Sequence, residues 1–294
     1  MREMNEIGLK AYGKINLALD VVRKREDGYH EVRMIMQTVK MYDYIKIKKS
    51  KEEGIRVYTN LSFLPTDENN LVYKAAKLLM DEFNINQGID IQLDKFIPVA
   101  AGMGGGSSDA ATVMVGINKM FGLGLKKNEL MERGVKIGAD VPYCILRGTC
   151  LAEGIGEKLT TLKPMPNCYV VVIKPAISVS TKFVYENLKA NELSYHPDID
   201  GMISDIEAGD LRAVAGKLGN VLETVTEEEY PVIADIKKSL INDGAINALM
   251  SGSGPTVFGL FEDRDVAEKA LQNVKASGLG KQFFVTEMYN IDRR

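Results

Sequence analysis

The feature that most constrains the fold of this chain is a glycine-dense segment, PVAAGMGGGSSDAA, at residues 98–111. Before it, apolar and polar residues alternate, which predicts a half-buried strand over 89–97. After it, apolar residues recur at helical spacing over 110–121. The segment therefore joins a strand to a helix, and its glycines allow backbone N–H groups to approach an anion closely.

The polar residues at the end of this segment favour a phosphate site. Ser107, Ser108 and Asp109 lie where a helix N-terminus exposes unpaired N–H donors and the positive end of its dipole. The segment is not a Walker A sequence, because no Lys-Ser or Lys-Thr pair follows the last glycine, and it lacks GxGxxG spacing. A cation from another part of the chain must therefore assist. The alternative, a mobile surface loop, does not explain the flanking patterns.

Composition excludes several classes of protein. The 294 residues suit two domains, and an apolar fraction of 45% is enough for a core in each. The net charge of −3 leaves no basic excess, so nucleic acid is not an expected partner. No apolar run approaches the ~20 residues of a membrane span, so we expect a cytoplasmic protein without a membrane partner. The three cysteines and two histidines have no metal-site or disulfide spacing.

The order of predicted elements indicates an α+β fold in two domains, at residues 1–160 and 161–294. Asp27-Gly28 is a hairpin turn signal in a strand-rich beginning. Asn69 or Asn70 caps a helix that runs to residue 83. The other elements of the first domain are strands at 7–12, 15–23, 29–39 and 43–49, a helix near 128–136, and a helix end or turn at Pro142. Those of the second are strands at 169–173, 246–250, 256–261 and 282–288, two or three helices over 198–241, and a helix from Asp263.

Lys14 and Asp140 are the charged residues whose surroundings point to chemistry. Lys14 lies between two predicted strands, where a buried ammonium would need a partner. The alternative is a strand-end lysine that reaches solvent. Asp140 could be a base, or only a turn or helix cap.

Two loops permit both a functional and a structural interpretation. Tyr29 and His30 follow the tight turn directly, so they could hold a planar heterocycle or simply form a hairpin. The small residues Gly252, Ser253 and Gly254 could approach the glycine-dense segment or only turn the chain.

Three blocks of the sequence together resemble the GHMP kinase superfamily. They are YGKIN at 12–16, PVAAGMGGGSSDAA at 98–111 and SGSGPTVFG at 251–259, in the order typical of the superfamily, and the resemblance spans nearly the whole chain. REDGYH at 25–30 and GADVPY at 138–143 are similar to one branch, which uses ATP to phosphorylate the 2-hydroxyl of 4-diphosphocytidyl-2-C-methyl-D-erythritol in the non-mevalonate isoprenoid pathway.

The resemblance implies a two-domain GHMP kinase fold. Its N-terminal domain is like domain 2 of ribosomal protein S5, and its C-terminal domain is a ferredoxin-like α/β sandwich. It also implies ATP and Mg²⁺ as cofactors and a small-molecule substrate that carries cytidine diphosphate. It leaves open whether the protein is a monomer or a homodimer, and which protein groups, if any, bind the metal.

The same resemblance implies roles for individual residues. Asp140 is the candidate general base on the acceptor hydroxyl, and Lys14 is its electrostatic partner. ATP would lie along the residues Pro98, Val99, Ala100, Ala101, Gly102, Met103, Gly104, Gly105, Gly106, Ser107 and Ser108.

The substrate residues follow from the same family pattern. Tyr29 and His30 are expected to hold the cytosine ring, with Asn16 near the substrate. Thr181 and Tyr185 would close the other side, although the family pattern has Phe where this chain has Tyr185. Stacking tolerates that exchange, because both rings present a π-face.

Two alternative functions remain open. The chain could be another GHMP small-molecule kinase, of the homoserine or mevalonate type, but the DGYH segment favours a nucleotide-bearing substrate. It could instead be a non-catalytic ATP sensor on the same fold, but the presence of both Lys14 and Asp140 argues against that.

Overall fold

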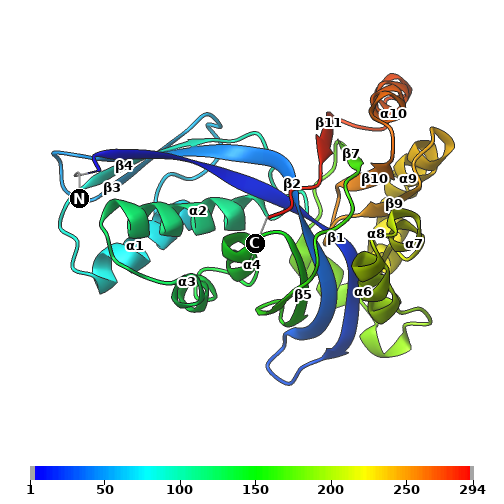
Figure 1. Cartoon of the computed structure of the whole chain (residues 1–294), viewed down its shortest axis with the longest axis horizontal. Helices are drawn as coiled ribbons and strands as arrows, with labels where there is room; N and C mark the ends of the chain where they lie inside the picture. Colours follow the sequence, from blue (N-terminus) through cyan, green and yellow to red (C-terminus); the bar gives the residue numbers. More distant parts are fainter. Residues whose placement is uncertain (1–3, 292–294) are drawn as a thin grey trace. The chain divides into compact units, whose positions relative to one another are not determined.

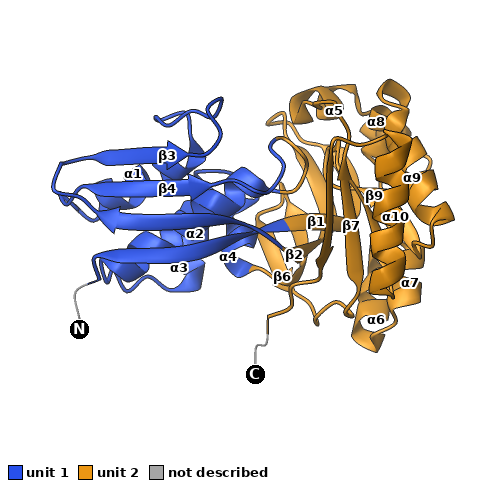
Figure 2. Cartoon of the chain, turned by 90° about the horizontal axis from the view of Figure 1, so that it is seen from above, with its two compact units in different colours: residues 1–13, 41–99, 104–146 blue, residues 14–40, 100–103, 147–294 orange. Residues whose placement is uncertain are grey.

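The computed structural model of the chain describes residues 4–291 and divides them into two compact units (Figures 1 and 2). Unit 1 contains residues up to 13, together with 41–99 and 104–146, and unit 2 contains 14–40, 100–103 and 147 onward. The two units alternate along the chain, so their division does not follow the expected boundary between residues 160 and 161. The sequence domains 1–160 and 161–294 stay a prediction.

Two long strands run through both units. Strand β1 covers Glu6–Lys24 and strand β2 covers His30–Lys49, where the sequence predicted two shorter strands in each case. The predicted breaks at residues 13–14 and 40–42 do not occur, since both segments continue their strands. The hairpin turn is confirmed: Gly28 has a φ of 84°, and the Asp27 carboxylate accepts a hydrogen bond from the Tyr29 N–H.

In unit 1, helices cover one face of a small sheet (Figure 1). Residues 44–49 of β2 pair antiparallel with β4 (Ile89–Asp94), which pairs parallel with β3 (Ile55–Thr59), a strand that the sequence analysis missed. The helices are α1 (Leu71–Glu82), α2 (Gly105–Met120), α3 (Lys127–Gly134) and α4 (Val141–Leu146). Gly116 lets α2 approach the sheet, since a Cβ there would lie 2.6 Å from Ile47 Cδ1.

The helix starts in unit 1 follow local chemistry. Asn70 is the N-cap of α1, and its side chain accepts from the Val72 N–H, which settles the choice between Asn69 and Asn70. The prediction of a helix end or turn at Pro142 is wrong, because Pro142 is the second residue of α4. A first-turn proline is tolerated, since its missing N–H would have no intrahelical partner there.

Unit 2 contains a four-stranded antiparallel sheet in the order β11-β7-β10-β9. Its strands are β7 (Tyr169–Lys174), β9 (Asn247–Met250), β10 (Val257–Phe261) and β11 (Gln282–Glu287), as the sequence predicted to within a residue. Helices α9 (Val232–Asn242) and α10 (Arg264–Ser277) pack on it, and Asp263 caps α10. Residues 170–173 are fully buried, which explains their uninterrupted apolar run.

The remaining elements of unit 2 are short. Strand β5 (Thr149–Gly154) joins β2 to β6 (Lys158–Thr161), and β8 (Gly219–Asn220) pairs parallel with β1. The helices before α9 are α5 (Thr181–Asn187), the 3₁₀ turn η1 (Ala190–Glu192), α6 (Ile199–Ala208), α7 (Leu211–Gly216) and α8 (Glu223–Glu229). Four helices thus lie between 198 and 242 instead of two or three, because Gly209 ends α6 and Asp210 immediately caps α7.

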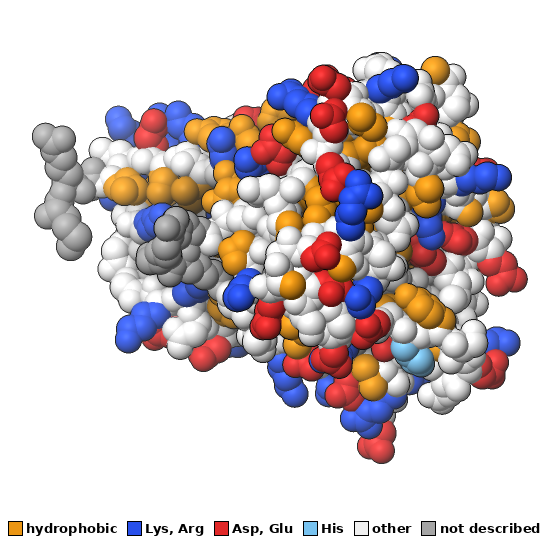
Figure 3. All heavy atoms as spheres, turned by 45° about the vertical axis from the view of Figure 1, so that its right-hand side comes forward, with side chains coloured by type: hydrophobic (Ala, Val, Ile, Leu, Met, Phe, Trp, Pro, Cys, Tyr) orange, Lys and Arg blue, Asp and Glu red, His pale blue; other side chains and the backbone are white. Residues whose placement is uncertain are grey.

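Charged side chains of both signs are interspersed on the face shown in Figure 3. Within residues 4–291, no helix has both the length and the apolar content to cross a bilayer.

Candidate functional site

The glycine loop, residues 98–108, ends in the first turn of α2 in unit 1. Gly104 is the N-cap with a φ of 65°, and the first helical hydrogen bond runs from the Ser108 N–H to the Gly104 carbonyl. The amides of Gly105, Gly106 and Ser107 precede that bond, and these residues are partly or fully exposed. A helix start of this kind provides N–H donors and a positive dipole end to a phosphate group.

The two serines of the loop differ in their surroundings. Ser108 is buried, and its hydroxyl donates to the Tyr12 carbonyl oxygen over 2.7 Å. Ser107 is partly exposed, and a Cβ built on Gly138 would lie 3.9 Å from its Oγ. The GADVPY segment therefore lies beside the start of α2 within unit 1.

Asp140 immediately precedes α4. Its carbonyl oxygen accepts from the Cys144 N–H, as at the start of a helix, and its side chain is partly exposed. The position suits a helix cap. The role of Asp140 as a base stays a prediction.

A buried triad that the sequence did not predict is formed by Asp43, Lys95 and Asp109 in unit 1. The Lys95 ammonium donates to Asp109 Oδ2 over 2.7 Å and to Asp43 Oδ2. Asp43 Oδ1 accepts from the N–H groups of Phe96 and Ile97, over 2.6 and 2.8 Å. Asp109 is thus at the helix start as predicted, but its side chain points into the core.

The charges of the triad act on one another. Burial raises the pKa of Asp109 to about 8, with Lys95 opposing this shift and Asp43 adding to it. Burial alone would lower the pKa of the Lys95 ammonium, but the two carboxylates raise it above its usual value. Lys95 therefore stays charged, whereas Asp109 gains a proton easily.

The part of the glycine loop in unit 2, residues 100–103, is fastened by neutral hydrogen bonds. Ala100 has a φ of 50° and Gly102 a φ of 71°, so the backbone turns sharply twice. The Ser251 hydroxyl donates to the Gly102 carbonyl oxygen over 2.9 Å. A Cβ on Gly102 would collide with the Ser251 carbonyl oxygen, which explains the glycine. The second loop, residues 251–255, thus approaches the glycine loop instead of only turning the chain.

Lys14 lies beside the same part of the loop. Its N–H donates to the Met103 carbonyl oxygen over 3.0 Å, and its ammonium donates to Asn16 Oδ1 over 2.6 Å. The Asn16 amide donates in turn to Met34 Sδ. Lys14 is buried, so the alternative of a lysine that reaches solvent is wrong. Asn16 is also fully buried, and it fixes the direction of the ammonium.

Other polar side chains position the second loop. The Asn220 amide donates to the carbonyl oxygens of Met250 and Gly252, over 2.9 and 2.8 Å. Thr181 Oγ1 and Ser253 Oγ are 2.7 Å apart, which brings the start of α5 to this loop. Thr181, expected near the substrate, therefore lies at the same loop as Ser251.

Aromatic rings gather near the hairpin in unit 2. The rings of His30 and Tyr185 are 5.1 Å apart between centroids and tilted by 38°. Partial burial is the main cause that lowers the pKa of His30, and the charge of Lys24 lowers it further. The ring is therefore neutral at neutral pH. Tyr29 is 61% exposed and so presents its ring to solvent. The structure thus pairs two of the three predicted ring-binding residues.

Among residues 4–291, no three His, Cys, Asp or Glu side chains group closely enough to hold a metal ion.

Comparison with known proteins identifies the family. The family model for the N-terminal domain of GHMP kinases matches residues 70–148, and the model for the C-terminal domain matches 202–279. The chain is 57% identical over 286 residues to 4-diphosphocytidyl-2-C-methyl-D-erythritol kinase of Lachnoclostridium phytofermentans, covering 97% of this chain and 98% of that one. The chain belongs to the 4-diphosphocytidyl-2-C-methyl-D-erythritol kinase family. A second member, from Lachnospira eligens, is 54% identical over 286 residues, covering 97% of this chain and 99% of that one.

Solved structures agree with membership of the 4-diphosphocytidyl-2-C-methyl-D-erythritol kinase family. A crystal structure of 4-(cytidine 5'-diphospho)-2C-methyl-D-erythritol kinase has a TM-score of 0.83 and 28% identity, covering 97% of this chain and 100% of that one. A crystal structure of homoserine kinase from Cytophaga hutchinsonii has a TM-score of 0.76 and 21% identity, covering 99% of this chain and 96% of that one. It shows the shared fold. The expected two-domain GHMP kinase fold is confirmed, and ATP use follows from the family.

Proposed function

We propose that this chain transfers the γ-phosphoryl group of ATP to the 2-hydroxyl of 4-diphosphocytidyl-2-C-methyl-D-erythritol, giving the 2-phosphate and ADP in the non-mevalonate isoprenoid pathway. The observation that carries the proposal is the 57% identity to the Lachnoclostridium phytofermentans kinase over 97% of the chain. The exposed first turn of α2 and the His30–Tyr185 ring pair are consistent with a phosphate and a planar base as ligands.

We assign proton transfer to Asp140 and charge compensation to Lys14. Phosphoryl transfer needs in-line positioning and compensation of charge on the transferring group, with a carboxylate that accepts the alcohol proton. Asp140, a partly exposed residue directly before α4, would accept that proton. Lys14 suits the second role because its ammonium is buried and oriented by Asn16, so water screens its charge little.

Some of the proposed substrate residues would contact the cytosine ring, and others would make polar contacts. Tyr29 and His30 would hold the cytosine ring with Tyr185 on the other side, and the neutral His30 ring could donate or accept a hydrogen bond. Thr181 would contact the substrate from its place at the second loop. Asn16 would act near the substrate through the orientation of Lys14.

The ATP phosphates would lie along residues 98–108. The N–H groups of Gly105, Gly106 and Ser107 would donate to phosphate oxygens at the start of α2. Mg²⁺, when bound, neutralises phosphate charge. Ser107 is the candidate protein ligand, because the Ser108 hydroxyl already donates to the Tyr12 carbonyl oxygen.

Substrate identity is tested by an ADP-release assay with three alcohols. Purified protein receives ATP and Mg²⁺ with the cytidylated methylerythritol, homoserine or mevalonate. We expect turnover with the first alcohol only. Turnover with homoserine or mevalonate would make the chain another GHMP kinase, and ATP binding without turnover of any alcohol would make it a sensor.

The base role is tested by Asp140→Asn. The exchange removes proton acceptance and conserves shape, so we expect kcat to fall by about 10²–10⁴-fold with little change in ATP affinity. Asp81→Asn is the control, since Asp81 only pairs with the exposed Lys77 on α1. An unchanged kcat in Asp140→Asn would refute the base role.

A further inference from the structure

The buried triad of Asp43, Lys95 and Asp109 touches the chain at both ends of the unit 1 part of the glycine loop. At the entry, Asp43 Oδ1 accepts from the N–H groups of Phe96 and Ile97, the last residues before Pro98. The Asn60 side chain fixes the same segment, because it accepts from the Lys95 N–H over 2.8 Å and donates to the Lys95 carbonyl oxygen over 3.1 Å.

At the exit, the triad reaches the first turns of α2. Asp109 is the fifth residue of the helix and accepts from Lys95 Nζ over 2.7 Å. Lys95 Nζ also lies directly under Gly105, since a Cβ built there would be 3.1 Å from it. One ammonium group thus connects the strand that enters the loop with the helix that leaves it.

The burial of Lys95 excludes a direct role with phosphate. Its side chain is only 4% exposed, and two carboxylates face its ammonium. The charge of Asp43 compensates that of the lysine, so little attraction remains for an anion outside the core. Asp109 Oδ1, in turn, is buried without a hydrogen-bond partner among the described residues, which costs free energy in the folded state.

We propose that Asp43, Lys95 and Asp109 are positioning residues, which fix the two ends of the glycine loop and so set the direction of the N–H groups of Gly105, Gly106 and Ser107. The proposal rests on the assignment of this loop to ATP in the proposed function. Its consequence is that the triad controls nucleotide binding without touching the nucleotide.

The test compares Asp109→Asn with the parent protein. The variant keeps the shape but replaces the carboxyl group that accepts from Lys95 Nζ with a weaker amide acceptor, so the helix start should move relative to the entry strand. We expect the KM for ATP to rise about tenfold, with kcat and the KM for the alcohol changed by less than about twofold. Hydrogen exchange in the nucleotide-free protein should become faster in residues 98–108 and stay unchanged elsewhere.

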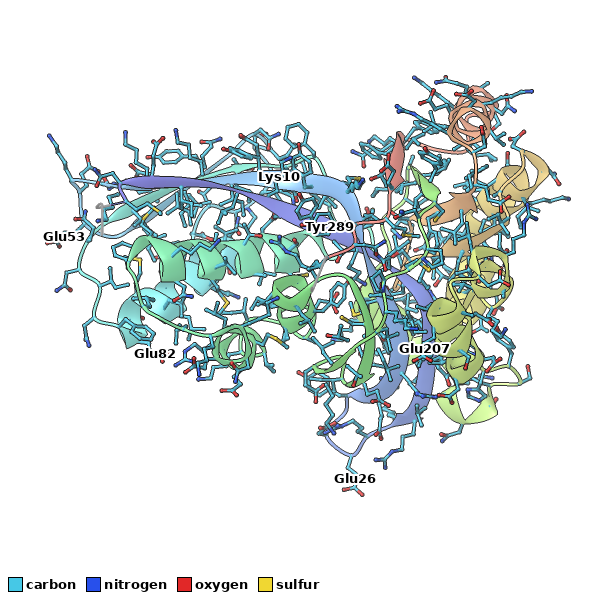
Figure 4. The ribbon with its side chains drawn as sticks, in the orientation of Figure 1. Lys10, Glu26, Glu53, Glu82, Glu207 and Tyr289 are labelled. Atoms are coloured by element: carbon cyan, nitrogen blue, oxygen red, sulfur yellow. The ribbon has the colours of Figure 1, made fainter. Side chains whose placement is uncertain are left out.

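One control and one second variant distinguish a positioning role of the triad from a role in stability alone. Glu82→Gln breaks the ion pair of Glu82 with Arg133, at the end of α1 in unit 1 (Figure 4), and should change neither KM nor loop exchange. Asp43→Asn keeps an acceptor for Phe96 and Ile97, and should repeat the Asp109→Asn result. If Asp109→Asn lowers the melting temperature but leaves both the KM for ATP and the loop exchange unchanged, the proposal is wrong.

The parent protein alone gives a further readout. The amides of Phe96 and Ile97 should exchange as slowly as those of the core, and fast exchange there would overturn the proposal even if no variant folds. ATP affinity by calorimetry keeps this test separate from the proposed function. If the parent binds ATP but turns over no alcohol, the proposed function fails while the positioning role can still be measured.

Discussion

The two parts of the glycine loop are held by different kinds of interaction. In unit 1, the loop end at Gly105 rests on the buried charges of Asp43, Lys95 and Asp109. In unit 2, Gly102 accepts a hydrogen bond from the Ser251 hydroxyl, and Met103 accepts one from the Lys14 N–H. Charges hold one part and neutral hydrogen bonds hold the other.

Because of this difference, substitutions in the two parts of the loop should reduce stability by unequal amounts. A buried ion that loses its partner is left uncompensated in a medium that solvates it poorly, whereas a lost neutral hydrogen bond costs only the net value of one bond. We call the part of the loop in unit 1 the ionic part and the part in unit 2 the neutral part. The stability of the ionic part should be sensitive to single substitutions and to pH, and that of the neutral part mainly to changes of backbone shape.

The largest effect is expected from Lys95→Met. The exchange conserves length but leaves the buried carboxylates of Asp43 and Asp109 facing each other, and should reduce the free energy of unfolding by about 3–5 kcal/mol. Urea denaturation measures it. Lys77→Met is the control, because Lys77 pairs with Asp81 on the surface and should cost less than about 1 kcal/mol. Equal losses in the two variants would contradict the importance of the ionic part.

Gly102→Ala should have the next largest effect. The methyl group would collide with the Ser251 carbonyl oxygen at a φ of 71°, and we expect a loss of about 2 kcal/mol or more together with weaker ATP binding. Gly278→Ala is matched in φ, at 74°, with no atom within 4 Å of the new Cβ. The difference between the two variants in thermal unfolding isolates the collision, and no difference would show that only the φ matters.

The pH dependence of stability should distinguish the ionic part of the loop from the neutral part. The pKa of Asp109 is raised from 3.8 to about 8, so between these values the unfolded chain has lost a proton that the folded chain keeps. The unfolding free energy of the parent should therefore fall relative to that of Asp109→Asn as pH rises through this window, by at most about 1.4 kcal/mol per pH unit. Denaturation at several pH values measures the difference, which a constant offset would contradict.

The smallest effect is expected from Ser251→Ala, in the neutral part. It removes one hydrogen bond to the Gly102 carbonyl oxygen and should cost about 1 kcal/mol, without a pH dependence between pH 4 and 8. Ser277→Ala, which removes a hydrogen bond from an exposed residue to the Val274 carbonyl oxygen, is the control and should cost less. A loss larger than that of Lys95→Met would reverse the comparison.

Local patterns predicted much of the fold. The strand, glycine loop and helix around residues 89–121 are confirmed because each depends on near neighbours in sequence. The long strands β1 and β2 were expected as four pieces, because the local sequence does not show that residues 13–14 and 40–42 continue the strands. Strand β3 carries too few residues to show a clear period.

The site was predictable only where family motifs carried it. Lys14, Asp140 and the glycine loop stand within motifs, whereas Lys95 has the appearance of an ordinary polar residue at a strand end. Its partners Asp43 and Asp109 are 52 and 14 residues away in sequence, so only the folded chain shows that three charges are buried together. Tyr29, Thr181 and Tyr185 stay predictions about substrate contacts.

A glycine in a phosphate-binding loop is ordinarily explained by the ligand that approaches it. At position 105 a second reason comes from the chain itself, because an added Cβ would lie only 3.1 Å from the Lys95 ammonium and 3.3 Å from Ile97 Cγ2. The two positions are therefore coupled, and whether alanine is acceptable at 105 depends on which residue occupies 95. Libraries that vary the loop alone would test Gly105 only against Lys95, and would miss that part of the constraint comes from a strand end ten residues earlier.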